Sequence, residues 1–224
     1  MLLKKLIKNL SPEKKIIQIR GLAIDSKKVK KGFIFFAIKG HKFNGEKFIN
    51  DAIKKGAVAV VCSKNTSYKK IDVPTIKTSN IRHLLSEISS KFYKKKPKNI
   101  IAVTGTNGKT SVAELFYQIL SLNNIPVASI GTLGVKYKNK VIKSKLTTPD
   151  TISIHKILNK IKKNKIDNVI LEASSHGLHQ NRIDQPTRYI RSTSGHFENP
   201  QQTILSQRSL SSLYRLSLSN QLVV

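Results

Sequence analysis

The sequence predicts an α/β protein in which a small N-terminal α/β domain is followed by an incomplete parallel-sheet domain. Three observations predict this. Apolar runs of strand length alternate with segments of helical periodicity, a glycine loop joins one such run to a helix, and a proline-broken run of lysines (residues 94–98) divides the chain. We therefore expect residues 1–96 to form the first domain and residues 97–185 the second.

In the first domain, strands and helices are expected to alternate. Apolar residues predict strands at 16–19, 33–37 and 58–61. Helical spacing predicts one helix near 48–53, ended by Gly56, and another over 81–92, capped by Ser79 or Asn80. This alternation indicates a parallel sheet covered by helices.

In the second domain, the strand predicted at 100–103 enters the loop Gly105–Gly108, and an amphipathic helix follows. Further strands are expected at 127–130 and 168–173, with a hairpin around 137–140, a turn at 174–177 and a helix that begins after Pro149. The sheet should place its ligands beyond the carboxyl ends of its strands.

The glycine loop has the composition of a phosphate-binding loop. Backbone N–H groups in such a loop, together with the helix N-terminus, bind phosphate oxygens. Lys109 would neutralise the β- and γ-phosphates, and the Thr110 hydroxyl would hold Mg²⁺, which makes this a P-loop-type ATPase domain. The common motif has a glycine where this chain has Val103. The alternative is a plain glycine turn with an exposed lysine.

Glu172 and Ser174 follow the last predicted strand and are expected at the same sheet edge as Lys109 and Thr110. A carboxylate there could hold Mg²⁺ that bridges nucleotide phosphates. The alternative is a strand-end carboxylate satisfied by its neighbours, although charged residues rarely end a buried apolar run without a partner.

The composition limits the cellular compartments and binding partners to be expected for this protein. No run of 18 apolar residues is present, so we expect no membrane insertion, and the charged N-terminal stretch does not read as a signal peptide. Cys62 is the single cysteine, which favours a reducing cytoplasm. The net charge of +29 supports non-specific nucleic-acid binding at most, because the lysines are not interleaved with aromatic residues; it would also attract an anionic small substrate.

Residues 186–224 differ in composition from the rest of the chain. No lysine follows Lys165, and Ser, Gln, Arg and Leu predominate. We expect a poorly structured tail and hypothesise that it is not native to the preceding fold. Translating the coding DNA in its other frames tests this hypothesis: a continued α/β pattern in another frame supports it, and its absence from all frames counts against it.

Four motifs together resemble the Mur ligases. Asp25-Ser26-Lys27 with Gly32–Gly40 and Gly45 resembles their N-terminal domain, and residues 104–110 (Thr-Gly-Thr-Asn-Gly-Lys-Thr) are similar to their ATP loop. Residues 147–149 (Thr-Thr-Pro) and 172–182 (Glu-Ala-Ser-Ser-His-Gly-Leu-His-Gln-Asn-Arg) resemble the members that add the third peptide residue, the MurE type. The resemblance covers about residues 15–184.

The resemblance implies an ATP-dependent amide ligase of peptidoglycan precursor synthesis. It would activate UDP-MurNAc-L-Ala-D-Glu as an acyl phosphate, which the amine of a diamino acid (diaminopimelate or lysine) then attacks. The chemistry consists largely of positioning and charge neutralisation. The implied cofactors are ATP and Mg²⁺, the implied location is the cytoplasm, and no specific nucleic-acid partner is expected.

The resemblance also implies roles for particular residues. Lys109 and Glu172 would be catalytic, and Thr110 and Glu172 would serve Mg²⁺. ATP would be held by the loop and helix start: Gly105, Thr106, Asn107, Gly108, Lys109, Thr110 and Ser111. The UDP-muramoyl-peptide would be held by Ser26, His41, Lys42, Phe43, Thr147, Thr148, Ser174, Gln180 and Arg182. Ser26 could instead be a turn residue, and Thr147 and Thr148 could merely cap a helix.

The chain also departs from the family pattern. Members continue after the arginine with an Asp-His motif, a lysine that is carbamylated and a C-terminal domain, and none of these follows Arg182 here. We therefore expect little or no ligase activity from this truncated chain alone. Two alternatives stay open: another Mur or folylpolyglutamate-type ligase, and a non-enzymatic basic module that binds nucleotides or nucleic acid.

Overall fold

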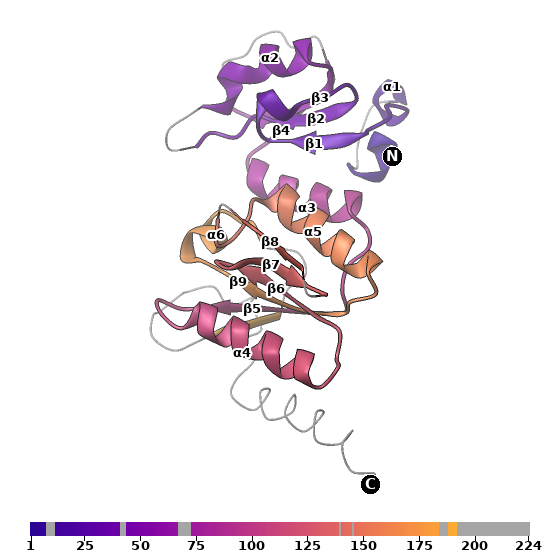
Figure 1. Cartoon of the computed structure of the whole chain (residues 1–224). Helices are drawn as coiled ribbons and strands as arrows, with labels where there is room; N and C mark the ends of the chain where they lie inside the picture. Colours follow the sequence, from indigo (N-terminus) through magenta and orange to yellow (C-terminus); the bar gives the residue numbers. More distant parts are fainter. Residues whose placement is uncertain are drawn as a thin grey trace. The chain divides into compact units, whose positions relative to one another are not determined.

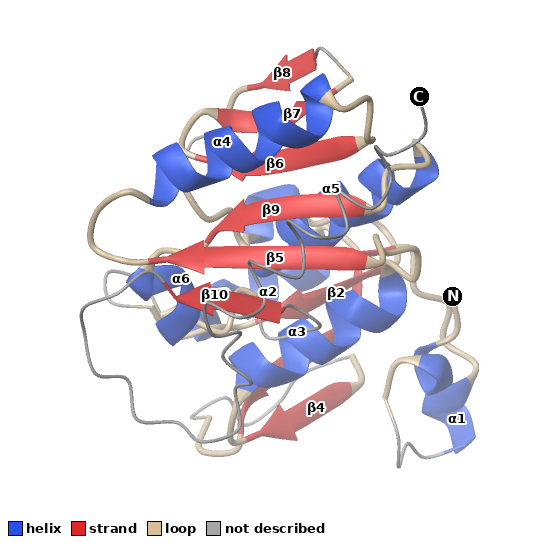
Figure 2. Cartoon of the chain, turned by 90° about the horizontal axis from the view of Figure 1, so that it is seen from below, coloured by secondary structure: helices blue, strands red, loops and turns tan. Residues whose placement is uncertain are grey.

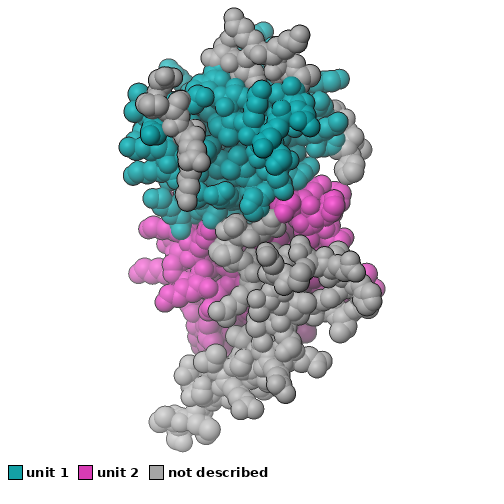
Figure 3. Space-filling view, turned by 180° about the vertical axis from the view of Figure 1, so that it is seen from behind, with its two compact units in different colours: residues 1–94, 151–156 teal, residues 95–150, 157–224 magenta. Residues whose placement is uncertain are grey.

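A computed structural model describes residues 1–7, 12–40, 44–66, 73–138, 140–144, 146–183 and 188–191. The chain divides into two compact units (Figure 3). Unit 1 comprises Met1–Lys94 with Thr151–Lys156, and unit 2 comprises Lys95–Asp150 with Ile157–Val224. The break between Lys94 and Lys95 lies inside the lysine-rich stretch (residues 94–98) at which the sequence predicts the domain boundary.

Unit 1 is built on a four-stranded parallel sheet of order β1-β2-β3-β4. The strands are β1 (Gly21–Ala23), β2 (Phe33–Phe36), β3 (Ala57–Ser63) and β4 (Thr75–Thr78). The helices are η1 (Leu3–Lys5), α1 (Pro12–Lys15), η2 (Ser26–Lys28), η3 (Gly45–Phe48), α2 (Ile49–Lys54) and α3 (Ile81–Phe92). The predicted strands at 33–37 and 58–61 and the two predicted helices are present.

The first predicted strand is wrong. Residues 16–19 pair with the N-terminus, through the Leu2–Gln18 bridge and the Ile19 N–H donated to the Met1 carbonyl, while β1 begins two residues later. The Phe33 ring lies against Gly21 so closely that a Cβ there would come within 2.4 Å of it. A glycine that weakens the local strand signal is thus required by packing.

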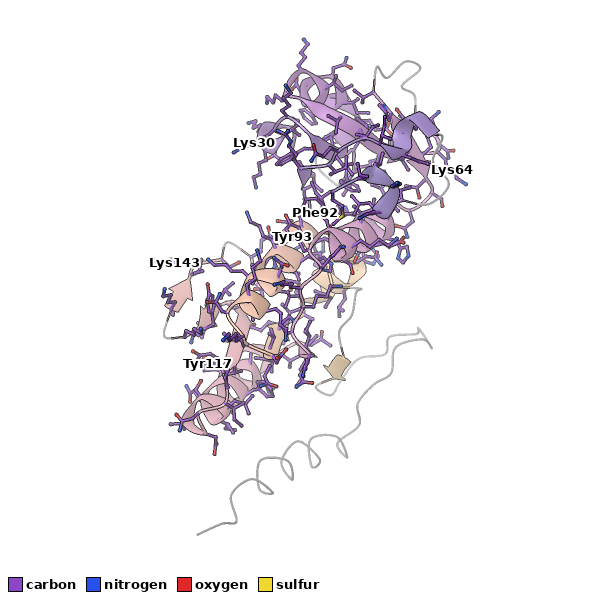
Figure 4. All side chains as sticks on the ribbon, turned by 90° about the vertical axis from the view of Figure 1, so that its right-hand side faces the viewer. Lys30, Lys64, Phe92, Tyr93, Tyr117 and Lys143 are labelled. Carbon is purple, nitrogen blue, oxygen red and sulfur yellow. The ribbon has the colours of Figure 1, made fainter. Side chains whose placement is uncertain are left out.

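Helix α3 shows why its predicted bounds are correct. The Asn80 side chain accepts a hydrogen bond from the His83 N–H (2.9 Å), which satisfies one of the free donors at the helix start. Leu85 and Ile88 are buried in the core of unit 1. The helix ends at Phe92, whose ring meets that of Tyr93 edge to face with centroids 5.1 Å apart (Figure 4).

Unit 2 contains a six-stranded sheet of order β10-β5-β9-β6-β7-β8 (Figure 2). Its strands are β5 (Asn99–Thr104), β6 (Val127–Gly131), β7 (Gly134–Tyr137), β8 (Lys140–Ile142), β9 (Asn168–Glu172) and β10 (Arg188–Arg191). Strand β7 pairs with β6 and with β8 in the antiparallel direction. The pairs β10–β5, β5–β9 and β9–β6 are parallel.

The helices of this part of the chain are α4 (Lys109–Leu122), α5 (Thr151–Lys163) and α6 (Ser175–His179). Helix α4 lies on one side of the six-stranded sheet and α5 on the other (Figure 1). Residues 174–177, predicted as a turn, contribute to the short helix α6, which the Ser174 side chain caps by accepting the Gly177 N–H.

The structure differs from the prediction at the end of the chain. Strand β10 lies within residues 186–224, which the sequence analysis treats as a poorly structured tail, and it pairs in parallel with β5. The domain boundary at residue 185 remains a prediction. Residues 192–224 lie outside the described residues. No helix among the described residues is long and apolar enough to cross a membrane.

An ion pair attaches the hairpin to α4. Lys136 Nζ of β7 donates to Glu114 Oε2 of α4 (2.7 Å) and lies 6.0 Å from the centroid of the Tyr117 ring, which Figure 4 labels. The hydrogen bond from Lys136, helped by one from Gln118, lowers the pKa of Glu114 despite partial burial. The pair therefore favours the folded state when the carboxyl is ionised.

We expect Glu114→Gln to lower the free energy of unfolding by about 0.5–1 kcal/mol at neutral pH. Because the pKa of Glu114 is lower in the folded state, this contribution is complete above the unfolded pKa and is lost as pH falls through the folded pKa. Thermal melts at neutral and acidic pH measure the difference. Glu87→Gln, which removes the exposed pair with Lys91, is the control and should change little. An equal loss from Glu114→Gln at both pH values would contradict this assignment.

Candidate functional site

Three neighbouring parallel strands of unit 2 end together. In the sheet register Val103 of β5 pairs with Glu172 of β9, and Leu171 pairs with Ile130 of β6. The residues that directly follow or end these strands therefore meet at one edge of the sheet. This edge carries the glycine loop after β5, the Glu172 carboxylate and the turn after β6.

The glycine loop leads into α4 as the sequence predicts. Gly108 is the residue before the helix, and its φ of +78° lies in the left-handed region that favours glycine. A Cβ at this position would have no atom within 4 Å, so the space above the loop is open. No side chain caps α4, which leaves backbone donors at its N-terminus for an anion.

The Lys109 side chain folds back over this loop. Its ammonium donates to the backbone carbonyls of Gly105 (2.6 Å) and Thr106 (3.1 Å). Thr106, Asn107 and Ser111 are exposed. The lysine is thus held at the loop by neutral acceptors, and binding an anion there would replace weaker hydrogen bonds by charge-assisted ones.

Glu172 lies at the centre of the site and is only 2% exposed. Thr110 donates its hydroxyl to Glu172 Oε2 (2.9 Å). Thr132, directly after β6, donates its N–H to Oε1 (3.0 Å) and its hydroxyl to Oε2 (3.0 Å). These three donors are neutral, and no salt bridge joins Glu172 to a cation within the described part of the chain.

Gly131 makes room for this carboxylate. A Cβ on Gly131 would lie 2.0 Å from Glu172 Oε1, which no real contact tolerates. The sequence predicts Glu172 and Thr110 as site residues, whereas the contacts of Gly131 and Thr132 emerge only from the structure. The signal that could have identified them is a glycine followed by a hydroxyl residue at the carboxyl end of the strand predicted at 127–130.

The Thr147-Thr148 segment lies beside Glu172 in two different ways. Thr147 Oγ1 is 3.2 Å from Thr132 Oγ1 at the exposed side of the site. Thr148 is buried: its hydroxyl donates to the Glu172 carbonyl (2.9 Å) and accepts the Ser174 N–H (2.9 Å). Thr148 therefore fixes the backbone after β9 rather than facing open space.

Arg182 and Gln180 form the outer part of the same network. Arg182 donates Nη1–H to the Thr148 carbonyl (2.6 Å) and its Nε–H and Nη2–H to Gln180 Oε1 (3.1 and 2.8 Å). Burial lowers the pKa of Arg182, and the charge of Asp150 opposes that shift. The guanidinium keeps its positive charge throughout the physiological range.

The remaining predicted residues belong to unit 1. Ser26 is buried at the start of η2, whose cap is the Asp25 side chain that accepts the Lys27 N–H (2.9 Å). His41, Lys42 and Phe43 lie outside the described residues. A pocket of about 600 Å³ opens near the carboxyl ends of β2, β3 and β4, and Lys39 and Asn44, which flank the 41–43 segment, both line it.

The donor set at Glu172 fits Mg²⁺. Magnesium takes hard oxygen ligands and is bound through one or two carboxylates together with phosphates and water. Thr110 donates its hydrogen to Glu172 and so keeps its oxygen lone pairs for a cation. Among the described residues no three His, Cys, Asp or Glu side chains lie close enough together to hold a metal ion.

Comparison with known families gives two matches. Residues 18–93 match the family described as Mur ligase family, catalytic domain, and residues 103–193 match the Mur ligase middle domain. The second match runs beyond residue 185 and includes β10.

Several curated relatives carry the description UDP-N-acetylmuramoyl-L-alanyl-D-glutamate--2,6-diaminopimelate ligase. The protein of Brucella melitensis is 40% identical over 183 residues, which are 82% of this chain and 37% of the relative. That of Zymomonas mobilis is 43% identical over 175 residues (78% and 36%), and that of Alkaliphilus oremlandii is 38% identical over 206 (89% and 41%). The chain thus spans little more than a third of their length.

Solved structures agree on the fold. A structure with the same description as these relatives matches with a TM-score of 0.70 at 24% identity, covering 97% of this chain and 44% of that one. The MurF ligase of Thermotoga maritima in complex with ADP matches with a TM-score of 0.52 at 21% identity, covering 80% and 39%. The mixed α/β architecture predicted from the sequence is confirmed.

We expect Gly131→Ala to lower the free energy of unfolding of unit 2 by about 2–4 kcal/mol, because the new methyl group displaces Glu172 from its three donors. Gly108→Ala is the comparison: it adds a methyl group in open space and costs only the strain of its positive φ, about 1 kcal/mol. Urea unfolding measures both. Equal losses from the two variants would show that Glu172 is not held against Gly131.

Proposed function

Since the chain belongs to the Mur ligase family, we propose that it carries the N-terminal domain and part of the central domain of an ATP-dependent amide ligase that adds 2,6-diaminopimelate to UDP-MurNAc-L-Ala-D-Glu. The observation that carries this proposal is the hydrogen bond between Thr110 of the glycine loop and the buried Glu172 at 2.9 Å. It joins the glycine loop to a carboxylate that forms no salt bridge with any described residue, an arrangement that suits a Mg²⁺–nucleotide site. The identity of 38–43% to diaminopimelate ligases supports the choice of substrate.

ATP would lie over the loop from Gly105 to Ser111. The N-terminal backbone donors of α4 and the open space above Gly108 support this placement of the phosphates. Lys109 would leave the carbonyls of Gly105 and Thr106 and neutralise the β- and γ-phosphates. Thr110 and Glu172 would hold Mg²⁺, which would offset the negative charge of the phosphates.

The first chemical step would transfer a phosphoryl group. A carboxylate oxygen of the D-glutamyl residue attacks the γ-phosphorus, the bond to the β–γ bridging oxygen breaks, and ADP leaves with the electron pair. The amine of the diamino acid then attacks the acyl carbon, and phosphate leaves. Because the chain spans little more than a third of its relatives, we assign no residue here to binding of the diamino acid or to amide formation.

The muramoyl-peptide would lie beside the metal site. Thr147 has its hydroxyl at the exposed side of the Glu172 cluster, and Arg182 supplies a positive charge that suits a carboxylate. Thr148 and Ser174 would act indirectly, because their hydroxyls fix the backbone after β9. The Gln180 side-chain oxygen accepts hydrogen bonds from two nitrogens of the Arg182 guanidinium and would set the orientation of that group.

The UDP end would bind to unit 1, through Ser26 and the segment His41–Lys42–Phe43. Lys39 and Asn44, on either side of that segment, line a pocket of about 600 Å³. A pocket of this size accommodates a small ligand, and the carboxyl ends of parallel strands are the usual place for one. Since the chain is similar to Mur ligases, we propose a cytoplasmic location.

We expect the 224-residue chain to bind Mg-ATP and Lys109→Ala to bind it about tenfold to a hundredfold more weakly, because a charge-assisted contact to phosphate is lost. Isothermal titration calorimetry measures both affinities. Lys160→Ala, which removes an exposed lysine of α5, is the matched control and should bind as the unaltered chain does.

A second titration tests the substrate. UDP-MurNAc-L-Ala-D-Glu should bind, whereas UDP-MurNAc without the dipeptide and a folate should bind weakly or not at all. Equal Mg-ATP affinity of the Lys109 and Lys160 variants would contradict the nucleotide assignment, and preferential folate binding would favour a folylpolyglutamate-type ligase.

A further inference from the structure

Thr132 contacts the Glu172 carboxylate at both of its oxygens. Its backbone N–H donates to Oε1 and its hydroxyl donates to Oε2, each at 3.0 Å. Two contacts from one residue to both oxygens fix the plane of the carboxylate as well as its position. Thr110 provides a single contact, to Oε2.

These contacts use only part of the hydrogen-bonding capacity of the Glu172 carboxylate. An ionised carboxylate has about four lone-pair sites. Thr110 and Thr132 occupy two at Oε2, and the Thr132 N–H occupies one at Oε1. The remaining capacity lies at Oε1, so Thr132 determines which oxygen can still accept a ligand.

Gly131 limits the orientations that the Glu172 carboxylate can adopt. The carboxylate lies directly against this glycine, where a Cβ would come within 2.0 Å of Oε1. Glu172 is 2% exposed and therefore cannot turn into solvent without losing its donors. The orientation is thus set by the backbone of residues 131–132 from one side and by Thr110 from the other.

Thr132 also connects this carboxylate to the half-buried Thr147, since their hydroxyl oxygens are 3.2 Å apart. A hydroxyl has one hydrogen, and the charged acceptor Glu172 is the stronger partner for it. The Thr147 hydroxyl would then donate to the Thr132 oxygen. A substitution of Thr147 would therefore affect the Glu172 carboxylate through Thr132 alone.

We propose that Thr132 is a positioning residue for Mg²⁺: it orients the Glu172 carboxylate so that Oε1 stays available to the cation held with Thr110. This inference rests on the proposed nucleotide site and adds a residue to it. Thr132 acts on the metal site through Glu172, because its N–H and its hydroxyl hydrogen are both directed at that carboxylate.

The test compares Mg²⁺-dependent nucleotide binding by the full chain and two variants. Thr132→Val keeps the β-branched shape and the backbone N–H but removes the hydroxyl, whereas Thr132→Ser keeps the hydroxyl. Affinity for ATP is measured by calorimetry with Mg²⁺ and with a chelator in its place. The ratio of the two affinities isolates the contribution of the metal from any general change in the fold.

We expect Thr132→Val to reduce this ratio about tenfold, with the affinity in chelator unchanged, and Thr132→Ser to restore most of it. Thr75→Val, which removes a threonine hydroxyl in β4 of unit 1, is the matched control and should leave the ratio unaltered. A ratio in Thr132→Val equal to that of the unaltered chain would overturn this inference alone. Absence of any Mg²⁺-dependent binding by the unaltered chain would overturn both this inference and the proposed nucleotide site.

Discussion

The candidate site depends on one constraint: the carboxyl group of Glu172 is buried at the end of a parallel strand without a cationic partner among the described residues. Burying an unpaired charge is expensive unless hydrogen bonds or a cation compensate it. Thr110 and Thr132 supply three neutral donors, which hold the carboxylate but do not neutralise it. A divalent cation bound with nucleotide phosphates would complete this compensation.

The parallel sheet brings these groups together. Because β5, β9 and β6 are neighbours and run in the same direction, residues more than sixty positions apart in the chain meet at one edge. Thr148 and Ser174 then lock the backbone just beyond β9, and Arg182 binds the Thr148 carbonyl from outside. These hydrogen bonds thus fix the backbone on which Glu172 is held.

Much of this could be predicted from the sequence because the signals are local. The strand, glycine loop and helix around Lys109 are consecutive in the chain, and a strand that ends in Glu172 indicates an unusual carboxylate. Thr132 and Gly131 were missed because their role depends on a contact with a different strand. Strand β1 was misplaced for a similar reason: packing of the Phe33 ring on Gly21 outweighs the stronger local signal of residues 16–19. Strand β10 lies beyond the change in composition that suggested a boundary, and only its pairing with β5 reveals it.

The most direct test of the Glu172 site is to locate the metal itself. Crystals of the chain grown with Mn²⁺ in place of Mg²⁺ and a non-hydrolysable ATP analogue would reveal the metal by anomalous scattering. We predict a peak within coordination distance of the Thr110 hydroxyl, next to Glu172, with the phosphates over the loop from Gly105 to Gly108. A nucleotide bound with its phosphates elsewhere, or a loop occupied without metal near Glu172, would contradict the account.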